Sequence, residues 1–171
     1  MQTGHNVILV GMPGVGKSTV GVLLAERLGL GFLDTDIELQ TREGRKLQQI
    51  IAAKGLDGFR RIEEETILSL SVRSHVVSTG GSVVYSVKAM EHLKRRGRVC
   101  HLDIEPQLLR DRLDDIDIRG IVMAPGQSIE SLYQERYPLY MKYADITVSS
   151  GNLTLSQLLE RIDSALAALD G

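Results

Sequence analysis

Residues 11–18 read Gly-Met-Pro-Gly-Val-Gly-Lys-Ser and match the pattern G-x-x-x-x-G-K-[ST] of a phosphate-binding loop. Glycines at these positions let successive backbone N–H groups turn toward one phosphate. In such a loop the lysine, here Lys17, reaches the β- and γ-phosphates, and the hydroxyl of the next residue, here Ser18, binds Mg²⁺. A glycine-rich turn could match by chance, but an apolar run at 7–10 precedes the loop and a helical pattern follows it. The chain is therefore expected to bind a nucleoside triphosphate through Gly14, Val15, Gly16, Lys17, Ser18 and Thr19.

Two aspartates, Asp34 and Asp36, follow the second apolar run at 32–33. Ligands of open parallel sheets bind beyond the carboxyl ends of the strands, so both carboxylates are expected beside the triphosphate. One carboxylate that holds a metal-bound water suffices for Mg²⁺, which keeps several of its waters. The other carboxylate can accept a hydrogen bond or a proton from a substrate hydroxyl. The alternative is structural, with one aspartate as a helix N-cap and the other in a turn.

Arg60 opens a long helical pattern, three and four positions before Glu63 and Glu64. That spacing is typical of an ion-paired surface face. The same spacing also suits a guanidinium that a carboxylate holds toward an anionic substrate.

An irregular stretch at 113–127 is long enough to form a mobile lid over an active site. Arg119 lies in its middle, and Arg136 lies on the helical pattern that follows. The alternative is a solvated loop that carries an idle arginine.

The third and fourth apolar runs also end in candidate site residues. Gly80 and Gly81 follow the third run, where paired glycines allow a ligand to approach the backbone, although an ordinary turn has the same composition. Asp103 ends the fourth run in the pattern D-x-E, which resembles the metal-binding strand of many ATPases. The alternative for Asp103 is an N-cap, because a proline two residues beyond Ile104 indicates a helix start.

Short apolar runs alternate with helical patterns along the whole chain, and no repeat or linker divides it. The expected strands are 7–10, 32–33, 76–78, 99–102 and 146–148, and the expected helices are 17–28, 47–54, 59–70, 87–95, 106–113, 128–143 and 155–169. This alternation predicts a parallel sheet with helices on both faces. A length of 171 residues suits one α/β domain, residues 1–171.

The composition argues against several other classes of protein. A net charge of −2 with scattered basic residues does not favour nucleic-acid binding, and the basic run at 94–96 is expected to end a helix. No apolar stretch approaches the roughly 20 residues of a membrane span, and the first six residues carry no export signal. The single Cys100 lies in an apolar run, and no histidine has metal-ligand spacing with it. We expect a cytoplasmic monomer whose partners are small molecules.

Taken in order, these motifs resemble the shikimate kinase family over nearly the whole chain. The resemblance runs through the phosphate loop, Phe-Leu-Asp-Thr-Asp at 32–36, Gly-Phe-Arg-Arg-Ile-Glu-Glu at 58–64, Thr-Gly-Gly at 79–81, the lid arginine, and Glu-Arg-Tyr-Pro-Leu-Tyr at 135–140. It implies a three-layer α/β/α P-loop fold like that of nucleoside monophosphate kinases, with a five-stranded parallel sheet ordered 2-3-1-4-5. It also implies phosphorylation of the 3-hydroxyl of shikimate by ATP and Mg²⁺, in aromatic amino-acid biosynthesis.

The resemblance also implies roles for single residues. Asp34 would hold a Mg²⁺-bound water beside Ser18, and Asp36 would bind the shikimate hydroxyls. The shikimate carboxylate would be bound by Arg60, Arg136 and the N–H of Gly81. Arg119 would close over the transferring phosphoryl group as a catalytic residue with Lys17 and Asp36, and Arg112 would lie against adenine.

Two positions depart from the family pattern. Ser82 replaces the third glycine after the third strand, and the lid reads Arg119-Gly120-Ile121 in place of Arg-Pro-Leu, after Asp114, Asp115 and Asp117. A glycine loosens the lid backbone, and acidic neighbours weaken its attraction for phosphates. These changes leave two alternatives open: a kinase for another small polyol acid such as gluconate, and a non-catalytic nucleotide-binding regulatory protein of the same fold.

Overall fold

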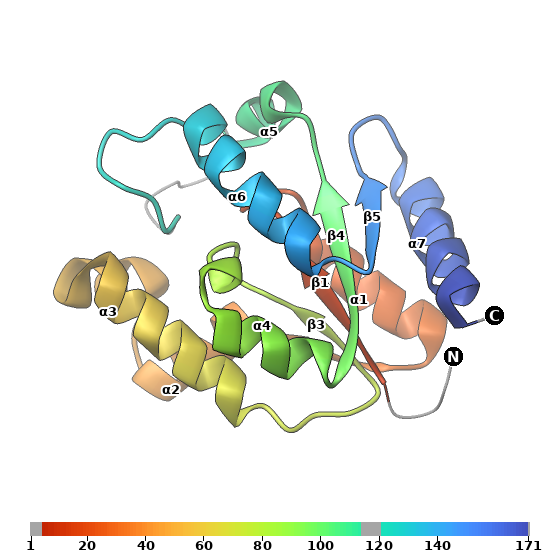
Figure 1. Cartoon of the computed structure of the whole chain (residues 1–171), viewed down its shortest axis with the longest axis horizontal. Helices are drawn as coiled ribbons and strands as arrows, with labels where there is room; N and C mark the ends of the chain where they lie inside the picture. The colour runs from red at the N-terminus through yellow and green to blue at the C-terminus, as the bar shows by residue number, and fades with distance from the viewer. Residues whose placement is uncertain (1–4, 114–120, 171) are drawn as a thin grey trace.

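The chain forms a parallel sheet between helices, in a computed structural model that describes residues 5–113 and 121–170 (Figure 1). Its strands are β1 (Asn6–Val10), β2 (Gly31–Asp34), β3 (His75–Ser78), β4 (Gly97–Asp103) and β5 (Ile146–Ser149). The strand order is β2-β3-β1-β4-β5, as predicted. In the central strand, Ile8 pairs with Val77 on one side and with Val99 on the other. Every residue of β1 is buried, which explains its continuous apolar run, because both faces of the sheet are covered.

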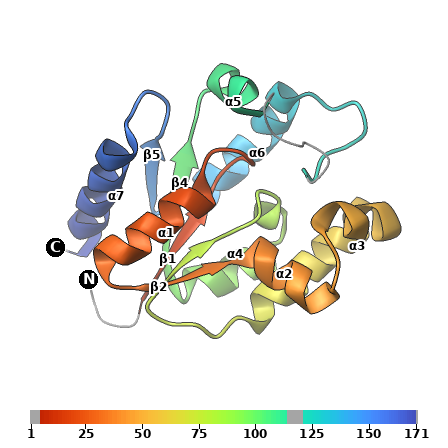
Figure 2. The ribbon, with the colours of Figure 1, turned by 180° about the vertical axis from the view of Figure 1, so that it is seen from behind.

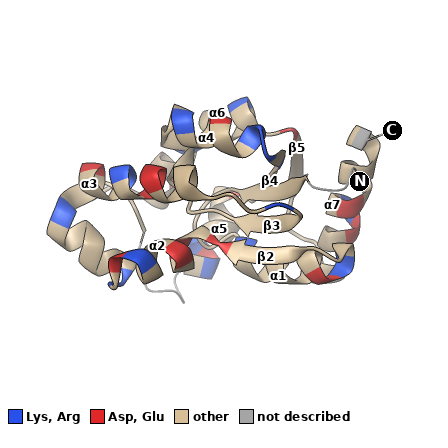
Figure 3. Cartoon of the chain, turned by 90° about the horizontal axis from the view of Figure 1, so that it is seen from below, with Lys and Arg blue, Asp and Glu red and all other residues tan. Residues whose placement is uncertain are grey.

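Helices cover the two faces of the sheet. On one face lie α1 (Lys17–Leu28) and α7 (Leu155–Asp170), which are in front in the view of Figure 2. On the other face lie α4 (Val87–Lys94) and α6 (Ile129–Tyr143), and Figure 3 shows α4 and α6 on one side of the strands with α1 on the other. Basic and acidic residues both occur along helices such as α3, rather than separating by sign (Figure 3). This arrangement confirms the three predicted layers.

The long helix α3 (Leu47–Ser69) extends past the sheet and packs against α4. It is interrupted at Gly55, whose φ of 67° and ψ of 178° are not helical. The two helices predicted at 47–54 and 59–70 are therefore two arms of one bent element. Both arms contact α2 (Thr35–Glu43), a helix that we did not predict.

Most other helix boundaries agree with the sequence patterns. Ser128 caps α6, and the Thr154 Oγ1 accepts a hydrogen bond from the N–H of Gln157 at 3.3 Å, as expected for the N-cap of α7. The basic run ends α4, with Arg95 as its C-cap. The remaining elements are a short 3-10 helix, η1 (Val83–Tyr85), and α5 (Pro106–Leu113). None of the described helices combines the length and the hydropathy needed to cross a bilayer.

Candidate active site

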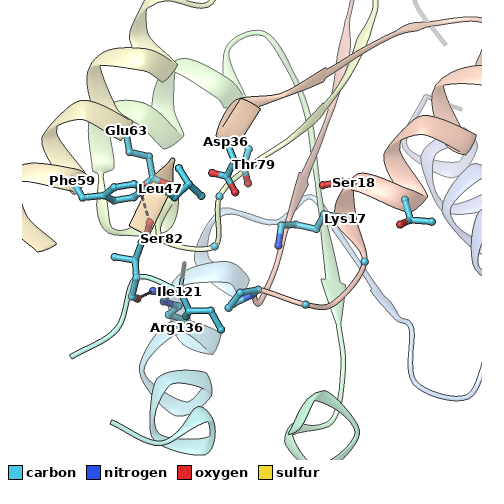
Figure 4. Close-up of a pocket in the computed structure, with 17 residues that line it drawn as sticks. Lys17, Ser18, Asp36, Leu47, Phe59, Glu63, Thr79, Ser82, Ile121 and Arg136 are labelled. Carbon is cyan, nitrogen blue, oxygen red and sulfur yellow. Dashed lines mark hydrogen bonds between the residues drawn. The ribbon is translucent and has the colours of Figure 1, made fainter. Parts of the chain in front are cut away.

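A cavity of about 430 Å³ opens at the carboxyl ends of β1 and β3, where the sequence predicts the ligand (Figure 4). Five parts of the chain form its walls: the phosphate loop, the start of α2, both arms of α3, the turn after β3, and α6 with the segment before it. The polar side chains that face it are Lys17, Ser18, Thr19, Asp36, Glu63, Thr79, Ser82 and Arg136, and the apolar ones include Leu47, Phe59, Ile121 and Val122. The structure thus brings together most of the candidate residues in one cavity.

Lys17 is held by its own phosphate loop. Its Nζ donates hydrogen bonds to the carbonyl oxygens of Gly11 at 2.9 Å and of Met12 at 2.8 Å. Burial lowers the pKa of Lys17 to about 8, although the negative charge of Asp36 opposes that shift. The ammonium is therefore charged at neutral pH and poorly hydrated, so a phosphate oxygen can replace the carbonyl oxygens as its partner.

Ser18 and Asp34 meet at the edge of the cavity. The Ser18 Oγ donates to the Asp34 Oδ2 at 2.5 Å, while Asp34 Oδ1 accepts hydrogen bonds from the N–H groups of Asp36 at 2.9 Å and of Ile37 at 3.4 Å. Asp34 is therefore the N-cap of α2, as one alternative predicted, and its second oxygen still faces Ser18. A hydroxyl beside a carboxylate at this place fits Mg²⁺, which prefers hard oxygen ligands and few of them from protein.

Asp36 lies in the first turn of α2 and points into the cavity (Figure 4). Burial raises its pKa to about 6, with a further contribution from the neighbouring charge of Asp34 and an opposing one from Lys17. A carboxylate with a pKa just below neutrality is suited to accept a proton and to release it again. The alternative that Asp36 is a turn residue is wrong, because the residue is helical.

Glu63 is a second carboxylate of this cavity, and we predicted it only as a partner of Arg60. Its Oε2 accepts a hydrogen bond from the Ser82 Oγ at 2.6 Å, whereas its Oε1 is buried without a partner among the described residues. Burial raises the pKa of Glu63 to about 7. A Cβ at Gly80 would lie 2.4 Å from Glu63 Oε1 and 2.9 Å from Asp36 Oδ1, so the two carboxylates approach this glycine together.

Arg136 is almost fully buried, with 1% of its surface exposed. Its Nε donates to the hydroxyl of Tyr85 at 3.2 Å, and its Nη2 donates to the carbonyl of Val122. A Cβ at Gly81 would lie 2.9 Å from Arg136 Nη1, which explains why this position is a glycine. Arg136 and the backbone of Gly81 therefore lie together at one side of the cavity, and their binding of the shikimate carboxylate stays a prediction.

Arg60 lies in an adjoining cavity of about 200 Å³ that shares Glu63 and Ser82 with the first. Its Cζ is 4.1 Å from the centre of the Tyr85 ring, and its Nε is buried without a hydrogen-bond partner in the described chain. Among the described residues, Arg60 does not form the expected ion pair with Glu63 or Glu64. Glu64 instead accepts a hydrogen bond from Ser86 at 2.6 Å, as Glu63 does from Ser82.

Arg112 and Asp103 lie outside the main cavity. Arg112 donates to the carbonyl oxygens of Val15 at 3.3 Å and of Ser150 at 3.5 Å, so it joins the phosphate loop to the loop after β5. Its contact with adenine stays a prediction. The carboxylate of Asp103 accepts a hydrogen bond from Tyr133 at 3.0 Å, whereas the carboxylate of Asp34 contacts Ser18 of the phosphate loop, which favours Asp34 over Asp103 as the metal-binding aspartate.

The lid arginine, Arg119, lies outside the described residues, as do Gly120 and the acidic positions 114–117. The described chain resumes at Ile121, and both Ile121 and Val122 line the cavity. The described part of the stretch predicted as a lid therefore forms part of the wall of the site.

Sequence reasoning missed two features of the walls. Phe59 faces the cavity although we did not single it out as a site residue, and its spacing of four from Glu63 could have placed both on one helix face. Tyr85, which contacts both Arg60 and Arg136, carried no local signal.

Comparison with known proteins identifies the family. The family model for shikimate kinase matches residues 13–167. The chain belongs to the shikimate kinase family. A shikimate kinase from Thiobacillus denitrificans is 36% identical to it over 174 residues, which cover 100% of this chain and 95% of the relative.

Solved structures agree with this membership. The structure of a shikimate kinase from Acinetobacter baumannii in complex with shikimate has a TM-score of 0.84 and 31% identity, and the match covers 96% of this chain and 93% of that one. A gluconokinase from Sinorhizobium meliloti has a TM-score of 0.57 and 21% identity, with 99% of this chain and 95% of that chain covered. The second likeness shows a shared fold and nothing more about the substrate.

Proposed function

We propose that this protein transfers the γ-phosphoryl group of ATP to the 3-hydroxyl of shikimate. One observation beyond family membership carries the proposal: a buried guanidinium, Arg136, shares a cavity with the phosphate-loop ammonium of Lys17 and the carboxylate of Asp36. The hydrogen bonds of Arg136 go to the phenols of Tyr85 and Tyr140 and to a peptide carbonyl, which are neutral. A buried cation bonded to neutral groups favours an anionic ligand at the same place, and shikimate is a carboxylate that carries hydroxyls.

ATP would bind with its phosphates on the backbone N–H groups of the loop at 11–18 and on the positive end of α1. Lys17 would exchange its bonds to the loop carbonyls for the β- and γ-phosphates. Mg²⁺, when bound, would neutralise charge that develops on the transferring group, and Ser18 with Asp34 would hold it. Arg112 lies beside the loop where the adenine would be contacted.

Asp36 would accept the proton of the 3-hydroxyl. As the hydroxyl oxygen bonds to the γ-phosphorus, the bond from that phosphorus to the β,γ-bridging oxygen breaks, and ADP leaves. The pKa of about 6 keeps Asp36 ionised at neutral pH, before the hydroxyl proton arrives.

The shikimate carboxylate would be bound by Arg136, Arg60 and the N–H of Gly81. Arg136 and Gly81 already face the cavity, and Arg60 would reach the carboxylate from the adjoining cavity. Arg119 would close over the phosphoryl group and act mainly in the transition state. We therefore expect Arg119→Ala to lower kcat far more than it raises the KM for shikimate.

The test is a coupled assay of ADP release with shikimate, quinate or gluconate as the acceptor, with Lys17→Ala as the inactive control. We expect turnover with shikimate and a near-complete loss in the control, because that variant lacks the charge aimed at the transferring phosphate. A preference for gluconate would mean that gluconate, and not shikimate, is the substrate. ATP binding without ADP release from any acceptor would indicate a non-catalytic nucleotide-binding protein.

A further inference from the structure

Tyr85 contacts both arginines of the site. The Cζ of Arg60 is 4.1 Å from the centre of its ring, and the Cζ of Arg136 is 5.3 Å from the same centre. The hydroxyl of Tyr85 accepts a hydrogen bond from Arg136 Nε at 3.2 Å. One side chain at the end of η1 therefore contacts a guanidinium from α3 and another from α6.

The hydroxyl of Tyr85 also acts as a donor. It donates to a carboxylate oxygen of Glu135, and burial together with this bond raises the pKa of Tyr85. A phenol that donates to a carboxylate becomes a better acceptor, so the bond to Glu135 strengthens the one from Arg136. Tyr85 thus remains a neutral phenol that orients Arg136 through its hydroxyl and Arg60 through its ring.

The same hydrogen-bond chain continues into the described C-terminal part of the stretch predicted as a lid, residues 121–127. The second carboxylate oxygen of Glu135 accepts from Gln127 Nε2 at 2.8 Å, and Gln127 Oε1 accepts from the N–H of Ala124 at 3.1 Å. Arg136 itself donates to the carbonyl of Val122. The position of Arg136 is therefore fixed from two sides, by Tyr85 and by the wall of the cavity.

We propose that Tyr85 is a positioning residue that holds Arg60 and Arg136 ready for one substrate carboxylate. The inference rests on the proposed function, because it takes that carboxylate to be the one on shikimate. Two guanidinium groups beside one ring repel each other, and the negative face of the ring with the phenolic oxygen offsets that repulsion.

The chemistry of a tyrosine suits this task better than that of a carboxylate. An aspartate or glutamate at position 85 would neutralise the arginines and compete with the substrate anion. The ring contact uses none of the N–H donors of Arg60, whose Nε has no partner among the described residues. The bonds of Arg136 to Tyr85 and Val122 use Nε and Nη2, whereas Nη1 lies beside Gly81, and the further partner of this guanidinium, Tyr140, is a neutral phenol. The donors needed for a carboxylate are therefore left available.

Steady-state kinetics of Tyr85→Phe and Tyr85→Leu test the proposal. The phenylalanine keeps the ring and loses the hydroxyl, so we expect the KM for shikimate to rise about tenfold, with kcat within about twofold and the KM for ATP unchanged. The leucine also loses the ring, and a further rise of about threefold is expected. Tyr143→Phe, at the far end of α6, is the matched control and should match the wild type. An unchanged KM for shikimate in both Tyr85 variants, or equal losses for both substrates, would overturn the proposal.

A second measurement needs no turnover. In the ¹⁵N-labelled ligand-free protein, the Nε–H of Arg136 should exchange slowly with water, and Tyr85→Phe should accelerate that exchange about tenfold or more. Equal exchange in the two proteins would mean that Tyr85 does not hold Arg136, whatever the substrate. If the wild type fails to phosphorylate shikimate while the exchange differs as expected, the proposed function is wrong and the positioning role of Tyr85 stands. If Tyr85→Leu does not fold, Tyr85→Phe alone is sufficient for both the kinetic and the exchange measurements.

Discussion

The hydroxyl of Ser18 lies 2.5 Å from Oδ2 of Asp34, although 16 positions separate the two residues in the chain. The other oxygen of the same carboxylate accepts the N–H of Asp36 at 2.9 Å and so begins α2. One side chain therefore connects the phosphate loop to the helix that carries the proposed proton acceptor. A metal ion bound at Ser18 and Asp34 would be coupled to the position of Asp36 through this cap.

Substitutions of Asp34 should separate its proposed role in holding Mg²⁺ from its role as the N-cap of α2. Asparagine caps a helix as well as aspartate does, so Asp34→Asn should keep the fold and raise the Mg²⁺ concentration for half-maximal activity by about tenfold. Asp34→Ala should lose the cap too, with an added destabilisation of about 1 kcal/mol. Magnesium titrations of activity and thermal unfolding of both variants measure these effects. Asp103→Asn is the control, and a larger Mg²⁺ effect there would move the metal site to Asp103.

The activity should depend on pH through two groups of the cavity. The pKa of Asp36 is raised to about 6 and the ionised form is needed, so kcat/KM for shikimate should rise as pH increases through 6. The pKa of Lys17 is lowered to about 8 and the charged form is needed, so kcat/KM for ATP should fall as pH increases beyond 8. Profiles from pH 5 to 10 with each substrate varied in turn test both limits. A flat profile for shikimate between pH 5 and 7 would remove Asp36 as the proton acceptor.

Local patterns in the sequence were sufficient to predict the phosphate loop and the parallel sheet. The glycine spacing and the flanking apolar and helical runs can each be recognised in a short stretch of sequence. The order of the parallel strands follows instead from the family resemblance. Helix α2 was missed because Asp34 and Asp36 were interpreted as a polar strand end. The N-cap Asp34, the acidic first turn and Gly44 after the last residue are signals in the sequence that favour this helix.

The contacts that shape the substrate end of the cavity could not be predicted in this way. Ser82 was identified only as a departure from the family pattern, yet it donates to the buried carboxylate of Glu63 across 19 positions. Tyr85 reaches Arg136 across 51 positions. Such pairs depend on how α3, η1 and α6 pack together, and neither helical periodicity nor motif spacing encodes that packing.

Glu63 should make the stability of the protein depend on pH. Its pKa is raised by burial from 4.5 to about 7, so between these values the folded chain binds a proton that the unfolded chain has lost. The free energy of unfolding should therefore decrease as pH rises from 4.5 to 7, by on the order of 3 kcal/mol over the whole window. Glu63→Gln cannot ionise and can still accept from Ser82, so it should unfold at a higher temperature than the wild type at pH 8 and at a similar one at pH 5. Thermal unfolding at both pH values is the measurement, and the same difference at each would contradict the assignment.

Arg60 and Arg136 should make the binding of shikimate depend on its carboxylate. A lysine cannot make the bidentate contact of a guanidinium, so Arg60→Lys and Arg136→Lys should weaken shikimate binding nearly as much as the alanine variants, by about 2–5 kcal/mol. The exposed Arg42 on α2 offers a control, since Arg42→Lys changes the same side-chain type at a position that lines neither the main cavity nor the adjoining one. Calorimetric titration with shikimate and with its methyl ester measures the contribution of the charge. The wild type should bind the ester far more weakly than the acid, and this difference should be smaller in each arginine variant, because only one guanidinium is then left to bind the carboxylate. Equal binding of acid and ester by the wild type would mean that the buried guanidinium of Arg136 serves a different anion.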